Sequence, residues 1–286
     1  MVDKVLGRIG EMAQLTRQEL EAICTRAVRS YYLGDHLQLC KILSRYKIYL
    51  DTRDIGIAPN MLMDGYWESW ITKFITQQVK PGMICIDAGA NFGYYSLVLA
   101  ELAGKEGKCI AVEPNSYLCR LMSYTNKVNE YHFDIVCKAL SDMPGEVTLS
   151  IPALYWGGGT IRSEKVDDEI MTEQVQMITM DSLVDQFHLQ RIDFIKMDCE
   201  GVEPLICKGM EKILQQNADL KMVMEFSPFM YRDAGAFTDF LFNRFQVAEI
   251  TGDSILVPYI EKDRAHLLNL DDHVDLFLTR KTKNEN

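Results

Sequence analysis

The stretch Ile84-Cys-Ile-Asp-Ala-Gly-Ala-Asn-Phe-Gly-Tyr-Tyr-Ser96 decides the fold. An apolar run of strand length ends at Asp87, small residues follow, and a helical pattern begins after Gly93. Gly89 and Gly93 let the backbone turn sharply and approach a ligand without a Cβ in the way. Open α/β sheets bind their ligands at the carboxyl ends of the strands. The stretch therefore predicts a buried strand, a ligand-binding turn and a helix.

The spacing of this turn and its acidic residues indicate the ligand. A dinucleotide-binding turn has the pattern G-x-G-x-x-G and holds a pyrophosphate, whereas Asp87, Gly89, Asn91 and Gly93 stand here at alternate positions. A carboxylate at the strand end would repel a pyrophosphate, but it suits a ligand with an ammonium group and a cationic sulfur. Glu113 ends the next predicted strand, where an acid can accept hydrogen bonds from ribose hydroxyls. The alternative is that each acid only caps its own turn. Taken together, the acids and the turn predict S-adenosylmethionine (SAM) as cofactor, with S-adenosylhomocysteine (SAH) as product.

A second group of charged residues occurs in Ile192-Asp-Phe-Ile-Lys-Met-Asp-Cys-Glu-Gly-Val-Glu203. With the period of two of a strand, Phe194, Lys196 and Asp198 share one face. A lysine within an apolar strand is costly unless it is paired, and Asp198 or Glu200 can supply the opposite charge. Buried titratable groups at the mouth of a sheet favour an active site. A purely structural ion pair is the alternative.

Together these two motifs resemble the FkbM family of methyltransferases. The resemblance runs from about Gly65, with Tyr66-Trp-Glu68, to the strand Val274–Arg280, and it includes Ala139-Leu-Ser-Asp-Met-Pro-Gly145 and Met224-Glu-Phe226. It implies an α/β fold with a seven-stranded, mostly parallel, Rossmann-like sheet of order 3-2-1-4-5-7-6, whose last strand is antiparallel. It also implies SAM-dependent O-methylation of a hydroxyl on a small molecule or glycan, such as a sugar, a glycolipid or a polyketide-type metabolite.

The resemblance also assigns residues to the cofactor. Its methionine end would lie against Asp87, Gly89, Ala90, Asn91 and Gly93. The ribose would lie against Glu113 with Asn115 beside it, and the adenine near Ala139, Leu140 and Ser141. Asp198 and Glu68 are further cofactor candidates, although Glu68, beside Trp67 and Trp70, can equally face the acceptor.

Methyl transfer to an alcohol needs a base for the hydroxyl proton. Asp198 and Glu200 are the leading candidates and Glu225, at the end of the next strand, is the third. Lys196 would orient a carboxylate or adjust its pKa. The same three acids could instead gather around a hard cation such as Mg²⁺, a hypothesis that we keep open but do not favour. The five histidines occupy no motif position and are expected to be structural or exposed.

The rest of the chain predicts a division into residues 1–60, a helical appendage, and residues 61–286, the SAM-dependent methyltransferase domain. Thr16-Arg-Gln-Glu19 is a capping box that begins a helix. Gly34 would end it, and Leu37, Cys40 and Leu43 suggest a second helix. The segment Ile57-Ala-Pro-Asn60 is expected to be a break. These helices also offer a surface for a homodimer, which we keep as a hypothesis.

Further along, strands alternate with helices from Met83 onward, which predicts a parallel sheet covered on both faces. Residues 146–179 interrupt this rhythm with two extra strands around Gly157-Gly-Gly159. Tyr155 and Trp156 precede these glycines, and they form either a mobile loop over the acceptor or a plain hairpin tip. Glu164-Lys-Val-Asp-Asp-Glu169 is expected to be a solvated run.

Composition narrows the class of protein. The chain of 286 residues has a formal net charge of −11, which opposes a phosphate-binding surface, so we expect no nucleic-acid partner. Residues 1–50 carry eight basic and five acidic side chains, so this segment is mildly basic and the rest of the chain is acidic.

The eight cysteines form no zinc pattern and fit a reducing, cytoplasmic setting. No apolar run is long enough for a membrane span, and Met1-Val-Asp-Lys4 shows no signal-peptide pattern. A non-catalytic SAM-binding scaffold and an RNA methyltransferase remain as alternatives.

Overall fold

The computed structural model describes residues 7–161 and 170–281, so the acidic run at 164–169 and the first four residues lie outside it. The centre of the molecule is a sheet of eight strands in the order β13-β12-β14-β11-β10-β4-β5-β6. Its strands are β4 (Ile84–Ala88), β5 (Lys108–Val112), β6 (Asp134–Val136), β10 (Phe194–Met197), β11 (Lys221–Phe226), β12 (Phe245–Ile250), β13 (Leu256–Tyr259) and β14 (Val274–Arg280).

The five strands from β6 to β11 run parallel, and β14 pairs antiparallel with both β11 and β12. The sequence predicted seven strands, and that number is wrong. The eighth is β13, which pairs antiparallel with β12 at the edge of the sheet. It is short, it contains Pro258, and three of its four residues are exposed. Its residues are apolar, but Pro258 argues against a central strand, because proline in a sheet is confined to edge strands, the first residue of a strand or bulges.

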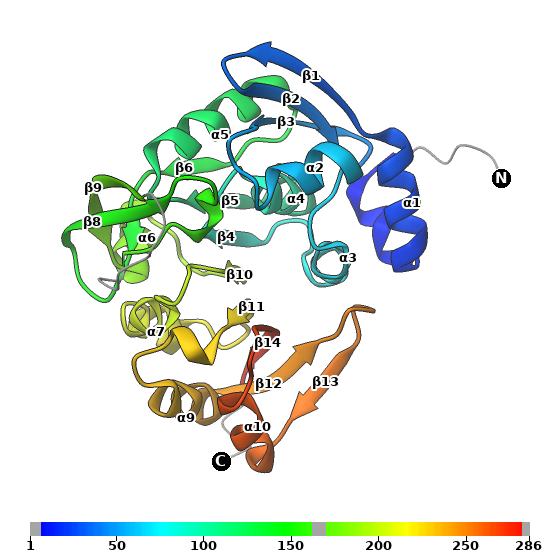
Figure 1. Ribbon diagram of the computed structural model, residues 1–286. Coiled ribbons are helices and arrows are strands. Elements are labelled where there is room, and N and C mark those ends of the chain that lie inside the picture. Colours follow the sequence, from blue (N-terminus) through cyan, green and yellow to red (C-terminus); the bar gives the residue numbers. More distant parts are fainter. Residues whose placement is uncertain (1–6, 162–169, 282–286) are drawn as a thin grey trace.

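Helices cover both faces of the sheet (Figure 1). They are α3 (Ser69–Gln78), α4 (Tyr94–Ala103), α5 (Ser116–Val128), α6 (Met180–Gln186), α7 (Glu203–Lys208), α8 (Glu211–Gln216), α9 (Ala234–Arg244) and α10 (Arg264–Leu268), with short 3-10 turns η3 (Pro228–Met230) and η4 (Glu261–Asp263). Side chains of successive strand residues enter two separate cores. Phe194 belongs to the core beneath α3 and α4, whereas Ile195 and Met197 belong to the core on the opposite face. This alternation confirms the predicted faces of the Lys196 strand.

Three strands from residues 139–152 and 170–178 form a separate sheet beside the cavity described below. It has the order β7-β9-β8, with β7 (Ala139–Leu140), β8 (Gly145–Pro152) and β9 (Ile170–Ile178). The two extra strands predicted here are confirmed as β8 and β9, which pair antiparallel. The short turn η2 (Trp156–Gly158) follows β8.

The N-terminal segment differs from the predicted pair of helices. The structure has η1 (Ile9–Gln14) and α1 (Arg17–Ala27), and α1 begins at the predicted capping box of Thr16 and Glu19. The second helix is wrong, because β1 (Arg29–Gly34), β2 (Leu37–Ile42) and β3 (Tyr46–Asp51) form an antiparallel sheet instead. Asp35 and His36 both have positive φ, as a tight two-residue hairpin turn requires.

The segment Ile57–Asn60 is also not a break. It begins α2 (Ala58–Asp64), with Pro59 in the first turn, where a proline is tolerated because its missing N–H would have no helical partner. The predicted boundary at residue 60 thus falls inside a helix, and the division into two domains stays a prediction.

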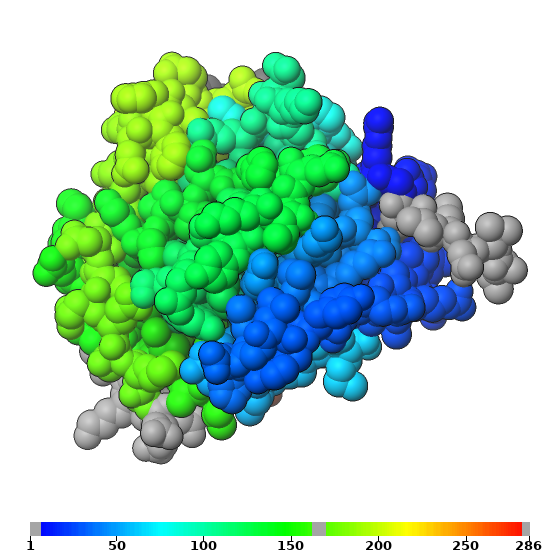
Figure 2. Space-filling model, turned by 90° about the horizontal axis from the view of Figure 1, so that it is seen from above, coloured from blue at the N-terminus to red at the C-terminus, as the bar shows by residue number. Residues whose placement is uncertain are grey.

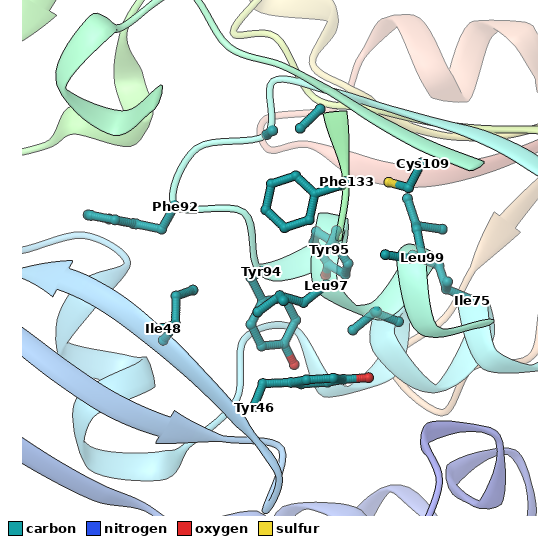
Figure 3. Packing of buried hydrophobic residues seen from close by; sticks show 14 of the residues in the cluster. Tyr46, Ile48, Ile75, Phe92, Tyr94, Tyr95, Leu97, Leu99, Cys109 and Phe133 are labelled. Carbon is teal, nitrogen blue, oxygen red and sulfur yellow. The ribbon is translucent and has the colours of Figure 1, made fainter. Parts of the chain in front are cut away.

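The N-terminal sheet packs closely on the rest of the molecule (Figure 2). Strand β3 lies against α5, and the Lys47 and Tyr49 amides donate to Asn129 Oδ1 at 2.9 Å and Thr125 Oγ1 at 3.1 Å. Figure 3 shows Tyr46 and Ile48 of β3 in one apolar core with Phe92, Tyr94 and other residues of the methyltransferase region. In the described part of the chain, no helix combines the length and apolar character that crossing a membrane requires.

Candidate active site

A cavity of about 570 Å³ opens where β4, β5, β10 and β11 end. Eleven of the residues predicted for the site line it: Glu68, Gly89, Ala90, Asn91, Glu113, Ala139, Leu140, Lys196, Asp198, Glu200 and Glu225. These residues are spread over 158 positions of the chain, and the sheet gathers them because the carboxyl ends of its parallel strands meet at one edge.

The β4–α4 turn forms one wall through its backbone. The Gly89 and Ala90 amides donate to the Val112 carbonyl at 3.0 and 3.1 Å, which folds the turn over the end of β5. Gly89 has φ of +77°, and a Cβ placed on it would lie 1.8 Å from the Asp198 carbonyl oxygen. Only glycine permits this approach, so the turn and the end of β10 close on each other.

Glu113 lies at the end of β5 and is held by two backbone amides. Its Oε2 accepts from the Asn91 amide and its Oε1 from the Asn115 amide, both at 2.9 Å. Burial raises the pKa of this carboxyl to about 7, against the lowering effect of the two amides. A carboxylate has about four acceptor positions, so each oxygen keeps one for a ligand hydroxyl.

Asp87 does not line the cavity. Its carboxyl group is buried beneath the turn, where Oδ2 accepts from Ser96 Oγ at 2.6 Å and Oδ1 has no partner. Burial raises the pKa of Asp87, while Lys196, which faces it across the β4–β10 pairing, acts in the opposite direction. We therefore place Asp87 behind the cavity wall, where its charge acts at a distance.

Three further residues that were predicted to bind the cofactor do not line the cavity. Gly93 is the N-cap of α4, and Asn115 caps α5 by accepting from the Tyr117 and Leu118 amides. Asn115 also lines a second, smaller cavity of about 310 Å³. Ser141 is buried, and its hydroxyl donates to Asp142.

Lys196 and Asp198 form an ion pair at the end of β10, with Nζ 2.7 Å from Oδ2. The ammonium group also lies 5.0 Å from the centre of the Tyr95 ring. Burial alone would lower the pKa of Lys196, but the carboxylates of Asp198, Glu68 and Asp87 outweigh it and raise that pKa. Lys196 is therefore charged, and it holds Asp198 in one orientation.

Three more acids face the cavity, and each has a raised pKa. Burial, with help from neighbouring carboxylates, raises the pKa of Glu68 to about 7, of Glu225 to about 7 and of Glu200 to about 9. Glu225 Oε1 accepts from Ser227 Oγ at 3.0 Å, and Glu68 Oε2 accepts from Tyr95 Oη at 2.7 Å. Such shifted carboxyl groups in a cavity are typical of catalytic sites.

Backbone strain also gathers at this cavity. Glu68, Asn91 and Glu200 all line it and have positive φ, of 37°, 51° and 54°. For a residue other than glycine this backbone conformation costs free energy, and such strained residues are concentrated at functional sites. Asn91 compensates with its own side chain, which accepts from the Phe92 amide at 2.7 Å.

Sequence reasoning missed several residues of the site. Trp67 and Trp70 line the cavity, and the Trp70 indole donates to Asp275 Oδ2 at 2.9 Å. Burial raises the pKa of Asp275 to about 6. His273, which is exposed as expected, also lines the cavity. His273 and Asp275 come from β14 and the residue before it, which reach the site only because β14 inserts between β11 and β12.

The Tyr155–Gly159 segment borders the cavity as well. Trp156 is buried, and its amide donates to Asp54 Oδ2 at 2.9 Å, whereas Tyr155 is partly exposed. The segment is thus anchored at Trp156, and its mobility stays a prediction. Across the described ranges, no set of three histidine, cysteine or acidic side chains is arranged to hold a metal ion. Asp198, Glu200 and Glu225 do not form such a set.

Residues 87–282 match the model of the methyltransferase FkbM domain. The chain therefore belongs to this family of SAM-dependent methyltransferases, as the two motifs indicated.

Solved structures with a similar fold share little sequence with the chain. A 16S rRNA N2 G1207 methyltransferase from T. thermophilus has 11% identity and a TM-score of 0.45, over 89% of this chain and 51% of that one. A precorrin-6y C5,15-methyltransferase from Geobacter metallireducens has 11% identity and a TM-score of 0.43, over 79% and 94%. A SAM-dependent O-methyltransferase from Thermotoga maritima has 14% identity and a TM-score of 0.39, over 77% and 68%. No curated protein matches the chain.

Proposed function

We propose that this protein is a SAM-dependent O-methyltransferase that acts on a hydroxyl of a small molecule or glycan. The observation that carries the proposal is the cavity at the strand ends. On one side Glu113 faces a glycine-lined turn, and on the other side carboxyl groups with raised pKa values surround Lys196. A site for an alcohol needs both a cofactor pocket and a base, and this cavity has residues suited to each.

The residues fit the cofactor at three points. Glu113 has a free acceptor position on each oxygen for the ribose hydroxyls. Gly89 leaves the turn open for a close ligand, and Ala139 and Leu140 offer an apolar surface for the adenine. The surrounding carboxylates suit a cationic sulfur. Asp87 would contribute charge from behind the wall, and Gly93, Asn115 and Ser141 would shape the turns rather than touch the cofactor.

When bound, SAM would supply an electrophilic methyl group for the acceptor oxygen, with its sulfur as the leaving group. The chain must align that oxygen and accept its proton. Glu225 is the best placed base, because its pKa of about 7 lies close to neutral pH. Glu200, with a pKa of about 9, is protonated at neutral pH and can donate a hydrogen bond to the acceptor. Lys196 holds the Asp198 carboxylate in place at the end of the cavity that we assign to the cofactor.

The cofactor assignment is tested by Glu113→Gln. The amide cannot accept from both the Asn91 and Asn115 backbone groups, and it has one acceptor fewer for the ribose. We expect SAH to bind about 10- to 100-fold more weakly in isothermal titration calorimetry, as loss of a hydrogen bond to a charged group predicts. Glu261→Gln, an exposed change in η4, serves as the control. Equal SAH affinity in the wild type and Glu113→Gln would remove the cofactor assignment.

The base is tested by Glu225→Gln together with a pH profile. We expect kcat to fall by about 10²- to 10⁴-fold while SAH affinity is retained. In the wild type with SAM bound, kcat/KM for the acceptor should rise with pH and level off at or below pH 7. The positive charge of SAM would lower the pKa of Glu225. Methyl transfer would be followed by mass spectrometry on an acceptor identified in a screen of sugars. A variant that keeps the wild-type rate and profile would exclude Glu225 as the base.

The same assay separates the enzyme from a non-catalytic scaffold, which would bind SAH normally and label no acceptor. The absence of a nucleic-acid partner and a cytoplasmic location stay predictions. The acidic cavity wall supports the first of them, since phosphate groups would meet like charge there.

A further inference from the structure

One wall of the cavity comes from a segment outside the part of the chain that matches the family. Residues 57–70 precede the matched region 87–282, yet eight of them line the cavity: Ile57, Asn60, Met61, Asp64, Tyr66, Trp67, Glu68 and Trp70. Glu68 is hydrogen-bonded to Tyr95, whose ring lies 5.0 Å from the Lys196 ammonium group. The other seven residues include two polar ones, Asn60 and Asp64, and five with aromatic or apolar side chains.

The N-terminal elements hold much of this segment in place. The Leu43 amide donates to the Gly65 carbonyl at 2.7 Å, and Cys40 Sγ donates to the Met61 carbonyl at 3.3 Å. Asp54 Oδ1 accepts from the Ile57 and Ala58 amides at 2.8 and 2.9 Å, and thereby sets the start of α2. The sheet β1–β3 and its following loop thus determine where α2 and its cavity-lining residues lie.

Arg17 of α1 holds the other end of the segment. Its guanidinium lies 5.1 Å from the centre of the Trp70 ring, and its Nε donates to Ser69 Oγ at 3.0 Å. Its Nη1 donates to the Gly252 carbonyl at 2.9 Å, in the loop before β13. One side chain therefore connects α1, α3 and the edge of the main sheet around Trp70. Figure 1 shows α1 beside α3, away from the centre of the sheet.

The charge of this wall restricts what can enter. Residues 57–70 contain Asp64 and Glu68 and no lysine, arginine or histidine. On the facing wall Glu225 is also acidic, while Glu200 is protonated at neutral pH. Among the described lining residues the positive side chains are Lys196, which is paired with Asp198, Lys138, which adjoins Ala139 at the proposed adenine end, and His273, which is paired with Asp272. An anionic group brought here would meet like charge, whereas aromatic rings and carboxylates suit a cationic or neutral group.

We propose that residues 57–70, positioned by the N-terminal sheet and Arg17, form the acceptor-recognition wall, and that this wall selects acceptors with an apolar face and without negative charge. The proposal rests on the proposed function, because it concerns the acceptor side of the same cavity. It gives residues 7–56 a role, which is to position a substrate-binding surface.

Acceptor charge is tested with three sugars that differ only at C6: 6-amino-6-deoxyglucose, glucose and glucuronate. Each is incubated with the full-length protein and SAM labelled in the methyl group, and labelled products are measured by mass spectrometry. We expect labelling in the order amine, neutral sugar, acid, with the acid at least about tenfold below the amine. Equal or greater labelling of glucuronate, with normal SAH binding, overturns the proposal. Normal SAH binding with no labelling of any of the three, or loss of SAH binding, would instead count against the proposed function.

The wall itself is tested by Trp67→Ala and Arg17→Ala, with Arg244→Ala as the matched control. Arg244 also stacks on an aromatic ring, at 4.3 Å from Phe240, and pairs with an acid, Glu211, but these partners belong to α9 and α8 rather than to residues 57–70. We expect Trp67→Ala and Arg17→Ala to raise the acceptor KM by about tenfold, with SAH affinity unchanged, and Arg244→Ala to change neither. Thermal unfolding confirms that each variant is folded. The proposal is overturned if the wall variants weaken SAH as much as the acceptor, or leave the KM unaltered.

Discussion

Single residues in the β4–α4 turn have requirements that the local sequence already expresses. Gly89 must have positive φ, and it must also lack a Cβ because the Asp198 carbonyl occupies that space. The first requirement is visible in a glycine-rich turn after a strand. The second depends on β10, which lies more than one hundred residues further along the chain, so only the folded molecule reveals it.

The variant Gly89→Ala tests this close approach. The added methyl group would force β4 and β10 apart at the cavity, and the left-handed backbone would be strained as well. We expect the free energy of unfolding to fall by more than about 1 kcal/mol, accompanied by loss of SAH binding. Gly10→Ala is the control, because nothing lies within 4 Å of its added Cβ and its φ is not positive. Urea denaturation followed by tryptophan fluorescence measures both, and equal stability of the two variants would contradict the prediction.

Among the elements, the N-terminal sheet shows how a local pattern can mislead. Leu37, Cys40 and Leu43 stand three residues apart, as on a helix, but the segment is a hairpin. In β3, apolar residues recur at every second position. Tyr46, Ile48 and Leu50 are buried, while Lys47 between them is exposed. Alternation of this kind is typical of a half-buried strand. It indicates a strand more strongly than the three-residue spacing indicates a helix.

Connections between elements also depend on single side chains, of which Asp54 is an example. Its two oxygens link the start of α2 to the Trp156 amide of η2, so one carboxylate joins two walls of the cavity. Asp54→Asn keeps one acceptor oxygen but replaces the other with a donor that faces an N–H. We expect a loss of about 1–3 kcal/mol in the free energy of unfolding. Asp35→Asn, in the exposed β1–β2 turn, should cost little when measured by the same urea titration. If the Asp54 variant is as stable as the control, this link does not contribute to stability.

At the scale of the whole molecule, the buried acids make stability depend on pH. Burial raises the pKa of Glu113 and Glu203 to about 7 and of Glu200 to about 9, all above the usual value of 4.5. A carboxyl group whose pKa is raised by folding stabilises the native state below its unfolded pKa. That contribution is lost as the pH rises through the folded pKa. Without cofactor, the free energy of unfolding should therefore decrease between pH 5 and pH 9.

Glu203→Gln isolates this effect, because Glu203 is buried outside the cavity lining and its Oε2 has no partner. Glutamine can still accept from the Cys199 amide, as Oε1 does at 2.7 Å. We expect the variant to lose less stability on going from pH 5 to pH 8, and to exceed the wild type by about 1–3 kcal/mol at pH 8. Urea titrations at both pH values measure this. A parallel pH dependence in the two proteins would show that Glu203 does not contribute.

The two helices predicted to carry a homodimer are not both present. Of that pair only α1 is a helix, and β1 instead exposes Tyr31 and Tyr32 at the edge of its sheet. The oligomeric state stays a prediction, to be measured by light scattering.

The amino-acid sequence alone determined the class of the protein, the parallel strands with acids at their ends, and the faces of the Lys196 strand. These features depend on periodicity and on neighbours within a few residues, where local physics is sufficient. Only the tertiary structure decided that Asp87 lies behind the wall, that Trp70 meets Asp275, and that the N-terminal strands position residues 57–70. Those contacts join segments far apart in the chain, and packing of the whole molecule selects them.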